Sequence, residues 1–185
     1  APDRARATLY SGVPGARSWT AEAVNLLVTD AVVTPGRAAE VWVSTFGDAP
    51  SFDGPVLGGR SGAEFLPMGT LQSWHMRLVA TPADVLSAVS KPGARGVYRW
   101  DAQAAPAPDW QLVGGADIGT DYFHAFAAGS DGRLWLGTER QGVWVSQDAG
   151  RTWAQPLGGG ETVRALAVDP ADPDREMPPG ETGEL

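Results

Sequence analysis

The sequence predicts an all-β protein built from repeated four-stranded antiparallel units. Apolar and polar residues alternate along many short stretches, no stretch of 11 residues carries a helical apolar stripe, and tryptophan closes successive units about 45 residues apart. Alternation with a period of two is typical of strands. A repeat of about 45 residues has the length of four short strands with their turns.

The first element of each unit is a hairpin. Two apolar runs are joined by a Pro- or Gly-containing turn at 32–44, 79–90 and 126–138. Leu134 and Leu136 in the last of these lie two residues apart, so they share one face of a strand. A fourth hairpin begins at 166–174 and then runs into the Pro- and Gly-rich "REMPPGETGEL".

The second element of each unit ends in tryptophan. One sheet cannot bury both of its faces alone, so neighbouring sheets must supply the core. An indole is large enough to fill the gap between two sheets, and we expect the closing tryptophans to do this. The copies of this element end at Trp19, Trp74, Trp110 and Trp153.

The copy that ends at Trp74 does not fit the repeat. Trp74 stands eight residues before Pro82 at the next hairpin turn, whereas the same step takes 16 to 20 residues elsewhere. Either one unit lacks a full fourth strand, or Trp74 is not the equivalent of the other closing tryptophans.

Repeated four-stranded units of this length are typical of a β-propeller, in which about four to eight blades pack around an axis. The chain supplies about three to four blades: three units, a leading part at 8–19 and a trailing strand at 162–169. Either it is part of a larger propeller, or the two ends share a fourth blade. We favour the incomplete ring, because the prolines after 175 suit a strand poorly. We divide the chain into blades at 1–174 and an acidic Pro/Gly-rich tail or linker at 175–185.

The stretch "GVWVSQDAGRTW" contains a turn whose residues all have a structural use. The carboxylate of Asp148 can accept hydrogen bonds from unpaired backbone N–H groups, as the hydroxyls of Ser146 and Thr152 do more weakly. Gly150 can adopt a positive φ without steric clash. Trp153 can fill the apolar gap below the turn.

This turn resembles the Asp-box, or BNR, repeat, whose pattern S-x-D-x-G-x-T-W it matches at all five specified positions. The resemblance implies a β-propeller of the kind seen in sialidases, xyloglucan-degrading hydrolases, sortilin-like receptors and photosystem-assembly factors. In that group the turn joins the third and fourth strands of a blade, away from the ligand-binding face, so the resemblance implies a structural role for Asp148. The resemblance covers most of residues 8–174, and the match to the pattern is close only over residues 124–174.

Composition excludes several classes of function. The net charge is -8 and no basic stripe is present, so nucleic acid is a poor partner. The chain has no cysteine and two histidines, and the aspartates of "DPADPD" do not follow the spacing of a known calcium loop, so we predict no metal site and no cofactor. No apolar run is long enough to span a membrane. The start "APDRAR" would suit a mature chain after leader removal, and on this we expect an extracytoplasmic protein.

The sequence contains no catalytic motif, and this favours a non-catalytic module. We expect this module to dock through the loops opposite the Asp-box turns. Its partner is either another protein or the remaining blades of a larger propeller. These loops lie at 45–62, 90–96, 114–124 and 138–142. Long loops on a rigid scaffold commonly carry function. The candidate residues in them are Phe46, Asp48, Phe52, Asp53, Arg60, Arg95, Asp117, Asp121, Tyr122, Glu139 and Arg140.

The alternative is a sialidase- or xyloglucanase-like glycoside hydrolase, or a propeller that binds carbohydrate. Such enzymes need two carboxylates about 5 to 10 Å apart, with aromatic side chains for the sugar rings. The loop acids and aromatic residues permit this chemistry, and Arg60, Arg95 and Arg140 occupy loops comparable to those of the sialidase arginines. No motif around these arginines supports giving them the role of the sialidase arginines, so we assign no catalytic residue.

Overall fold

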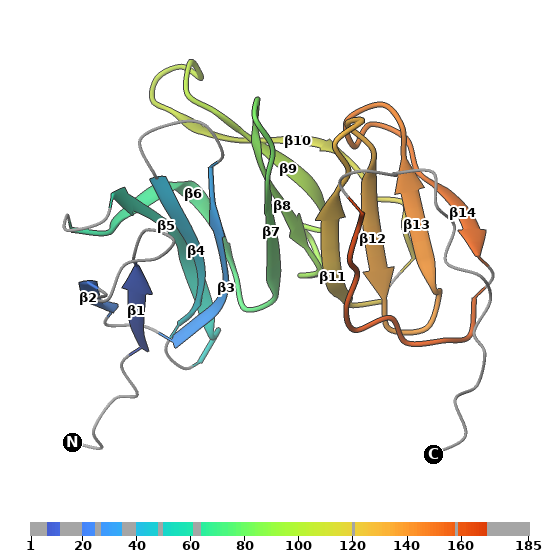
Figure 1. The fold of residues 1–185 in the computed structure, drawn as a ribbon, viewed down its shortest axis with the longest axis horizontal. Helices are drawn as coiled ribbons and strands as arrows, with labels where there is room; N and C mark the ends of the chain where they lie inside the picture. Colours follow the sequence, from blue (N-terminus) through green and yellow to red (C-terminus); the bar gives the residue numbers. More distant parts are fainter. Residues whose placement is uncertain are drawn as a thin grey trace.

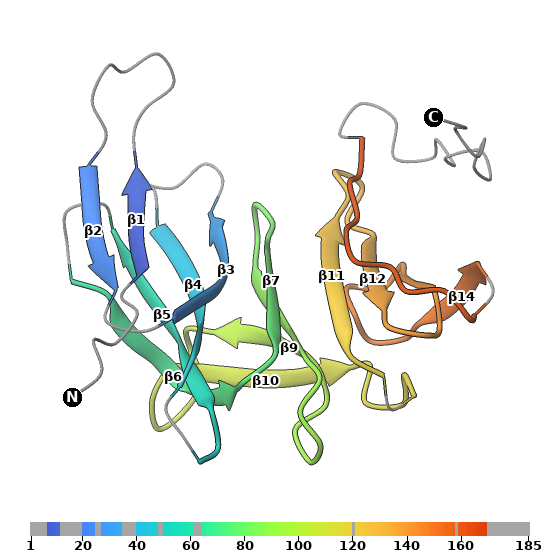
Figure 2. The same ribbon diagram turned by 90° about the horizontal axis from the view of Figure 1, so that it is seen from below.

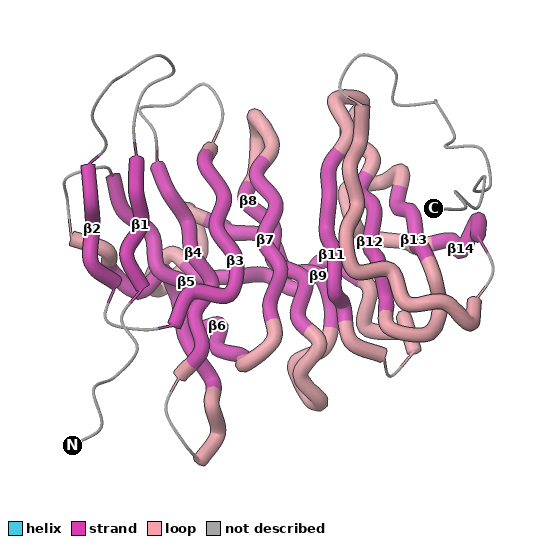
Figure 3. The backbone as a smooth tube through the Cα atoms, turned by 60° about the horizontal axis from the view of Figure 1, so that its bottom comes forward, coloured by secondary structure: helices cyan, strands magenta, loops and turns pink. Residues whose placement is uncertain are grey.

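The computed structural model describes residues 7–11, 20–24, 27–34, 40–47, 50–60, 64–119, 121–157 and 159–169. Over these residues every regular element is a strand, and Figure 3 shows only strands and loops. The prediction of an all-β chain is therefore confirmed. Trp19, Asp48 and the tail at 175–185 lie outside the described residues.

The strands form one two-stranded and three four-stranded antiparallel sheets. The two-stranded sheet contains β1 (Ala7–Ser11) and β2 (Thr20–Val24). The first sheet contains β3 (Leu27–Val33), β4 (Glu40–Phe46), β5 (Asp53–Arg60) and β6 (Leu66–Ser73). The second contains β7 (Met76–Ala80), β8 (Val85–Val89), β9 (Gly96–Asp101) and β10 (Asp109–Gly114). The third contains β11 (Phe123–Ala128), β12 (Leu134–Thr138), β13 (Val143–Ser146) and β14 (Ala154–Leu157).

The three four-stranded sheets follow one another in space in the order of the sequence (Figure 1). Their first strands lie side by side, because β7 contacts β3 on one side and β11 on the other. Figure 2 shows the sheets diverging from these first strands, with β6, β10 and β14 at their outer ends. The sheets form an open arc and not a closed ring.

Tryptophan fills the space between the first and second sheets. Trp42 on β4 is 3% exposed, and its ring lies 5.4 Å from Trp100 and 6.0 Å from Trp110 in edge-on contacts. Such edge-to-face pairs stabilise a core beyond the apolar area that they bury. The rest of this core consists of Val56, Leu71, Met76, Leu78, Val85 and Val89.

A second core lies between the second and third sheets. Leu134 and Leu136 of β12 pack there with Phe123 and Ile118, and Trp153 packs against them. Thus Trp110 and Trp153 both lie between neighbouring sheets, as the sequence predicts. A third, smaller cluster around Val43 covers the other face of the first sheet.

Trp74 does not occupy the position of the other closing tryptophans. The first sheet has a complete fourth strand, β6, and Trp74 comes directly after it. By contrast Trp110 lies inside the fourth strand of its sheet, and Trp153 comes just before β14. Aligning Trp74 with these tryptophans is therefore wrong, because it belongs to the connection that leads into β7.

Candidate functional site

The turn of residues 146–153, which we call the Asp turn, joins β13 to β14, the third and fourth strands of the third sheet. The Asp148 carboxylate accepts hydrogen bonds from the Thr152 backbone N–H at 2.8 Å and from the Thr152 hydroxyl at 2.6 Å. Ser146 Oγ donates to the same carboxylate and accepts from the Gly150 N–H, each at 2.8 Å. The Trp153 indole N–H donates to the Gly150 carbonyl at 2.9 Å.

These bonds explain the charge state of the aspartate. Hydrogen bonds from the Thr152 hydroxyl and backbone lower the pKa of Asp148 to about 2, since they stabilise the ionised form. Gly150 has a φ of 92°, a conformation that a side chain would strain. Each carboxylate oxygen is occupied by the turn itself, so the geometry gives Asp148 a structural use.

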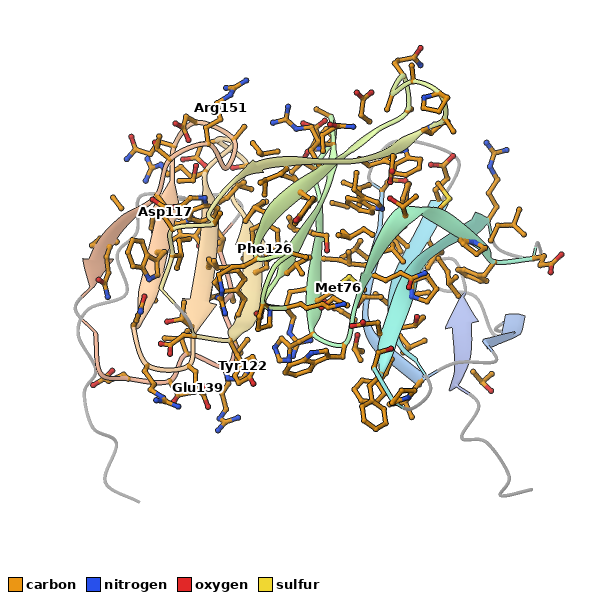
Figure 4. The ribbon with its side chains drawn as sticks, turned by 180° about the vertical axis from the view of Figure 1, so that it is seen from behind. Met76, Asp117, Tyr122, Phe126, Glu139 and Arg151 are labelled. Atoms are coloured by element: carbon orange, nitrogen blue, oxygen red, sulfur yellow. The ribbon has the colours of Figure 1, made fainter. Side chains whose placement is uncertain are left out.

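The turn and the predicted loops lie at opposite ends of the molecule. Figure 4 shows Arg151 of the turn at one end and Tyr122 and Glu139 at the other. We call the latter the loop end. It includes Trp74, whose ring contacts Tyr122, and we assign to it the connection from β4 to β5, which carries Phe46 and Phe52. Tyr122 and Glu139, which come from two of the candidate loops, therefore lie opposite the turn of residues 146–153.

The loop end carries a cluster of four rings, which we call the aromatic cluster: Trp74, His75, Tyr122 and His124. The Tyr122 ring lies 5.2 Å from Trp74 and 5.4 Å from His75, and the two imidazoles lie 5.4 Å apart. Trp74 and His75 precede β7, whereas Tyr122 and His124 flank the start of β11. The cluster therefore forms where the first strands of two sheets begin.

Backbone contacts hold the aromatic cluster in place. His75 Nε2 lies 2.9 Å from the Phe123 carbonyl oxygen, and Arg77 donates to the His124 carbonyl at 2.7 Å. Burial lowers the pKa of His75, and the nearby Arg77 charge lowers it further, although the bond to Phe123 opposes the shift. Burial is also the main cause of the lowered pKa of His124. Both imidazoles thus favour the neutral form.

At the connection from β4 to β5, Phe46 and Phe52 stack at 5.4 Å. Phe52 has a φ of 59° and is 44% exposed, and Tyr122 is 36% exposed. A bulky residue with positive φ is rare and is held by its surroundings. Here the Phe52 carbonyl accepts from the Gly47 N–H at 3.0 Å, which closes the loop between β4 and β5.

The carboxylates of the loop end have partners within the protein. Asp53 forms an ion pair with Lys91 at 2.5 Å, and Glu139 lies 3.8 Å from Arg140. Asp121 is 8% exposed and accepts a hydrogen bond from the Arg140 backbone N–H at 2.9 Å. Asp53 and Asp121 thus make contacts between loops, whereas Glu139 lies beside the exposed side chain of the next residue.

Arg95 also has a structural position. Its guanidinium donates to the Asp121 carbonyl at 2.5 Å and the Ser90 carbonyl at 3.0 Å, and it lies 5.0 Å above the Phe123 ring. This side chain therefore joins the second sheet to the start of the third. The Arg140 side chain reaches solvent at the loop end and is 76% exposed.

Two candidate residues do not join the others. Arg60 ends β5 and lies 3.7 Å from Glu40, next to the turn between β7 and β8, so it lies at the end of the Asp turn. Asp117 is exposed and lies between the two ends in Figure 4. Ile118 beside it is fully buried in the core between the second and third sheets, and this anchors the middle of the loop away from the loop end.

Sequence reasoning missed Trp74, His75 and His124 as site residues. The first two stand in the connection from β6 to β7, and the third is the second residue of β11. All three residues lie at or just before the first strand of a four-stranded sheet, β7 or β11. This shared position is the signal that could have indicated the aromatic cluster.

The end of the Asp turn has a cavity of about 540 Å³ between the first and second sheets. Trp42, Trp100, Met68 and Leu66 line its apolar part, and Glu40 and Asp84 line its rim. Both rim carboxylates pair with arginine, Glu40 with Arg60 and Asp84 with Arg99 at 3.5 Å.

Among the described residues no group of three or more His, Asp or Glu side chains has the geometry to hold a metal ion. Over the same residues no helix is long and apolar enough to cross a membrane. No protein-family model matches the chain, and neither a curated protein nor a solved structure is significantly similar to it.

Proposed function

We propose that this chain is a non-catalytic β-propeller module of the Asp-box type that docks a protein partner through its loop end. The observation that carries the proposal is the exposure of two aromatic side chains there: Tyr122 is 36% exposed and Phe52 is 44% exposed, and each contacts a neighbouring ring. Aromatic side chains held rigidly at a surface are typical anchors of protein interfaces.

Three further features support this proposal. The sheets diverge from adjacent first strands, as blades do around a propeller axis. The Asp turn lies at the far end from the aromatic surface, where it leaves the loops free to bind. The loop-end acids Asp53, Asp121 and Glu139 have partners within the protein, which argues against a pair of catalytic carboxylates.

The test is a comparison of loop-end and control variants. We expect the wild-type chain to capture a defined protein from extracts of its source, and Tyr122→Ala and Phe52→Ser each to weaken that capture at least about tenfold, as expected for interface anchors. Leu112→Ser is the matched control, because Leu112 is 53% exposed on β10. Equal capture by all variants would contradict the proposal.

Carbohydrate binding is the second candidate, because Trp74 and Tyr122 present neighbouring rings of the kind that contact sugars. Affinity electrophoresis in gels that contain soluble polysaccharides distinguishes the two. Retardation that is lost in Trp74→Ala and kept in Leu112→Ser would favour carbohydrate, and release of reducing sugar would favour the hydrolase.

A further inference from the structure

The cavity between the first and second sheets is bordered by a strand position that carries no side chain. Gly58 on β5 lies directly opposite Trp42 on β4, and opposite residues of an antiparallel pair share one face of the sheet. Trp42 belongs to the core that faces the second sheet, so Gly58 faces it as well, and both line the cavity. A Cβ at Gly58 would lie 2.7 Å from Cγ of Met68, so a larger residue there would displace Met68, another wall residue.

Between the second and third sheets the corresponding position is filled. Arg99 stands two residues before the end of β9, as Gly58 does in β5. It lies opposite Leu86, which belongs to the core that faces the third sheet. Its guanidinium donates to the carbonyl of Ala149 in the Asp turn at 3.3 Å and thus crosses the space between the two sheets. The space between the first and second sheets lacks such a bridge at Gly58.

The walls of this cavity are apolar and aromatic. Its volume of about 540 Å³ lies within the usual range for pockets that bind small molecules, about 300–1,000 Å³. Trp100 and Met68 in the wall are half-buried, and Leu66 at the mouth is 55% exposed. Methionine side chains adapt their shape to what they contact. These walls therefore suit the aromatic or aliphatic body of a ligand.

The rim of the cavity favours positive charge. Among the described residues that line it, Glu40, Glu64 and Asp84 are acidic and Arg60 is basic. The Arg60 side chain is 67% exposed and lies 3.7 Å from Glu40, and ion pairs of this exposed kind are weak. The chain as a whole has a net charge of -8. A concave site lined mainly by one sign of charge concentrates ligands of the opposite sign.

We propose that this cavity binds a small organic cation, an ammonium group attached to an aromatic or aliphatic body. The ammonium group lies at the rim with Glu40 and Asp84, one from each of the two sheets. The apolar body packs against Trp42 and Trp100, whose rings also attract cations. The site lies at the end of the Asp turn, so it does not depend on docking through the loop end.

The test uses three probes of similar size and different charge. Isothermal titration calorimetry of the chain with 2-phenylethylammonium chloride is expected to give a Kd of about 1 mM or tighter, which is within reach of a ligand of this size. Neutral 2-phenylethanol and anionic 3-phenylpropionate are expected to bind at least about tenfold more weakly, because neither offers a cation to the rim. Absence of binding by the cation, or equal binding of all three probes, would overturn the proposal.

Charge variants locate the site. The double variant Glu40→Gln with Asp84→Asn is expected to weaken binding of 2-phenylethylammonium at least about tenfold, since it removes two rim carboxylates. Asp117→Asn is the control, because Asp117 is exposed and lies outside the cavity. Circular dichroism checks that each variant folds. Unchanged binding in the double variant would contradict the proposal.

A matched pair of leucine variants tests the site without removing an ion pair. Leu66 lies at the mouth of the cavity and is 55% exposed, whereas Leu27 begins β3 opposite Phe46 and is 48% exposed. Leu66→Lys is expected to weaken binding of 2-phenylethylammonium about tenfold, because it places a like charge at the mouth. Leu27→Lys is expected to change it little. Equal effects of the two lysines would count against binding in this cavity.

Discussion

Replacing Ser90 by alanine tests the bond that joins the second and third sheets. The Ser90 hydroxyl accepts a hydrogen bond from the Phe123 backbone N–H at 2.7 Å, and both residues are fully buried. Alanine would leave this N–H without an acceptor. A buried donor without a partner costs about 1–3 kcal/mol, so we expect the free energy of unfolding to fall by about 2 kcal/mol.

Ser87→Ala is the matched control. Ser87 on β8 is also fully buried, but its hydroxyl has no hydrogen-bond partner. Its removal breaks no bond and deletes an unsatisfied polar group, so stability is expected to stay the same or to rise slightly. Urea unfolding followed by tryptophan fluorescence measures both variants. In thermal unfolding the Ser90 variant is expected to melt about 4–8 °C lower.

Equal loss of stability in the two variants would refute this reasoning. It would mean that the space left by a missing hydroxyl, and not the bond to Phe123, decides the outcome. A smaller loss for Ser90→Ala than for Ser87→Ala would refute it more strongly, since the bonded hydroxyl would then matter less than the unbonded one.

The other predictions concern packing and charge. Trp42→Ala is expected to lower the free energy of unfolding by about 3–5 kcal/mol, and Trp135→Ala by clearly less, because the Trp135 indole is only half-buried. Urea unfolding compares the two variants. Burial lowers the pKa of His75 and His124 below 6.5 in the folded chain, so the unfolded chain binds protons more readily. The contribution of the two neutral imidazoles to the free energy of unfolding is therefore fully present above about pH 6.5 and is lost as the pH falls below it. Urea unfolding midpoints at about pH 7.5 and pH 5 would measure this loss. The pKa of Asp148 is depressed from 3.8 to about 2, so the stability that its ionised carboxylate contributes is present above pH 3.8 and is lost as the pH falls toward 2. Asp148→Asn is expected to be less stable than the wild type at neutral pH and to lose less stability on acidification. Acid titration followed by circular dichroism would check this.

The parts of this fold that depend on short segments could be predicted from the sequence. Alternating apolar residues and Pro or Gly turns specify a hairpin within about a dozen residues. The turn at 146–153 contains its own hydrogen-bond donors and acceptors, so its residue types alone indicate its conformation. Local information was enough for the all-β class, the three sheets and the turn.

Several contacts between sheets could not be predicted, although the positions of Trp110 and Trp153 between neighbouring sheets could. Trp74 was misaligned because tryptophan occurs in connections as well as before fourth strands. Arg60 was misplaced because β5 runs the full length of the sheet and carries its last residue to the other end. The contact of His75 with His124 joins residues 49 positions apart in the sequence, through the packing of β7 against β11.

A comparison of two aspartates shows why repeated units can lose their sequence signature and keep their structure. In the turn, Asp148 accepts hydrogen bonds from the backbone and hydroxyl of Thr152, four residues along the chain. Asp109 on β10 accepts the same two bonds, at 2.7 and 2.6 Å, from Thr70 on β6 of the neighbouring sheet. Partial burial opposes ionisation of Asp109, yet these bonds prevail and lower its pKa. One Asp–Thr arrangement thus closes a turn locally and joins two sheets at a distance, and only the local version leaves a pattern in the sequence.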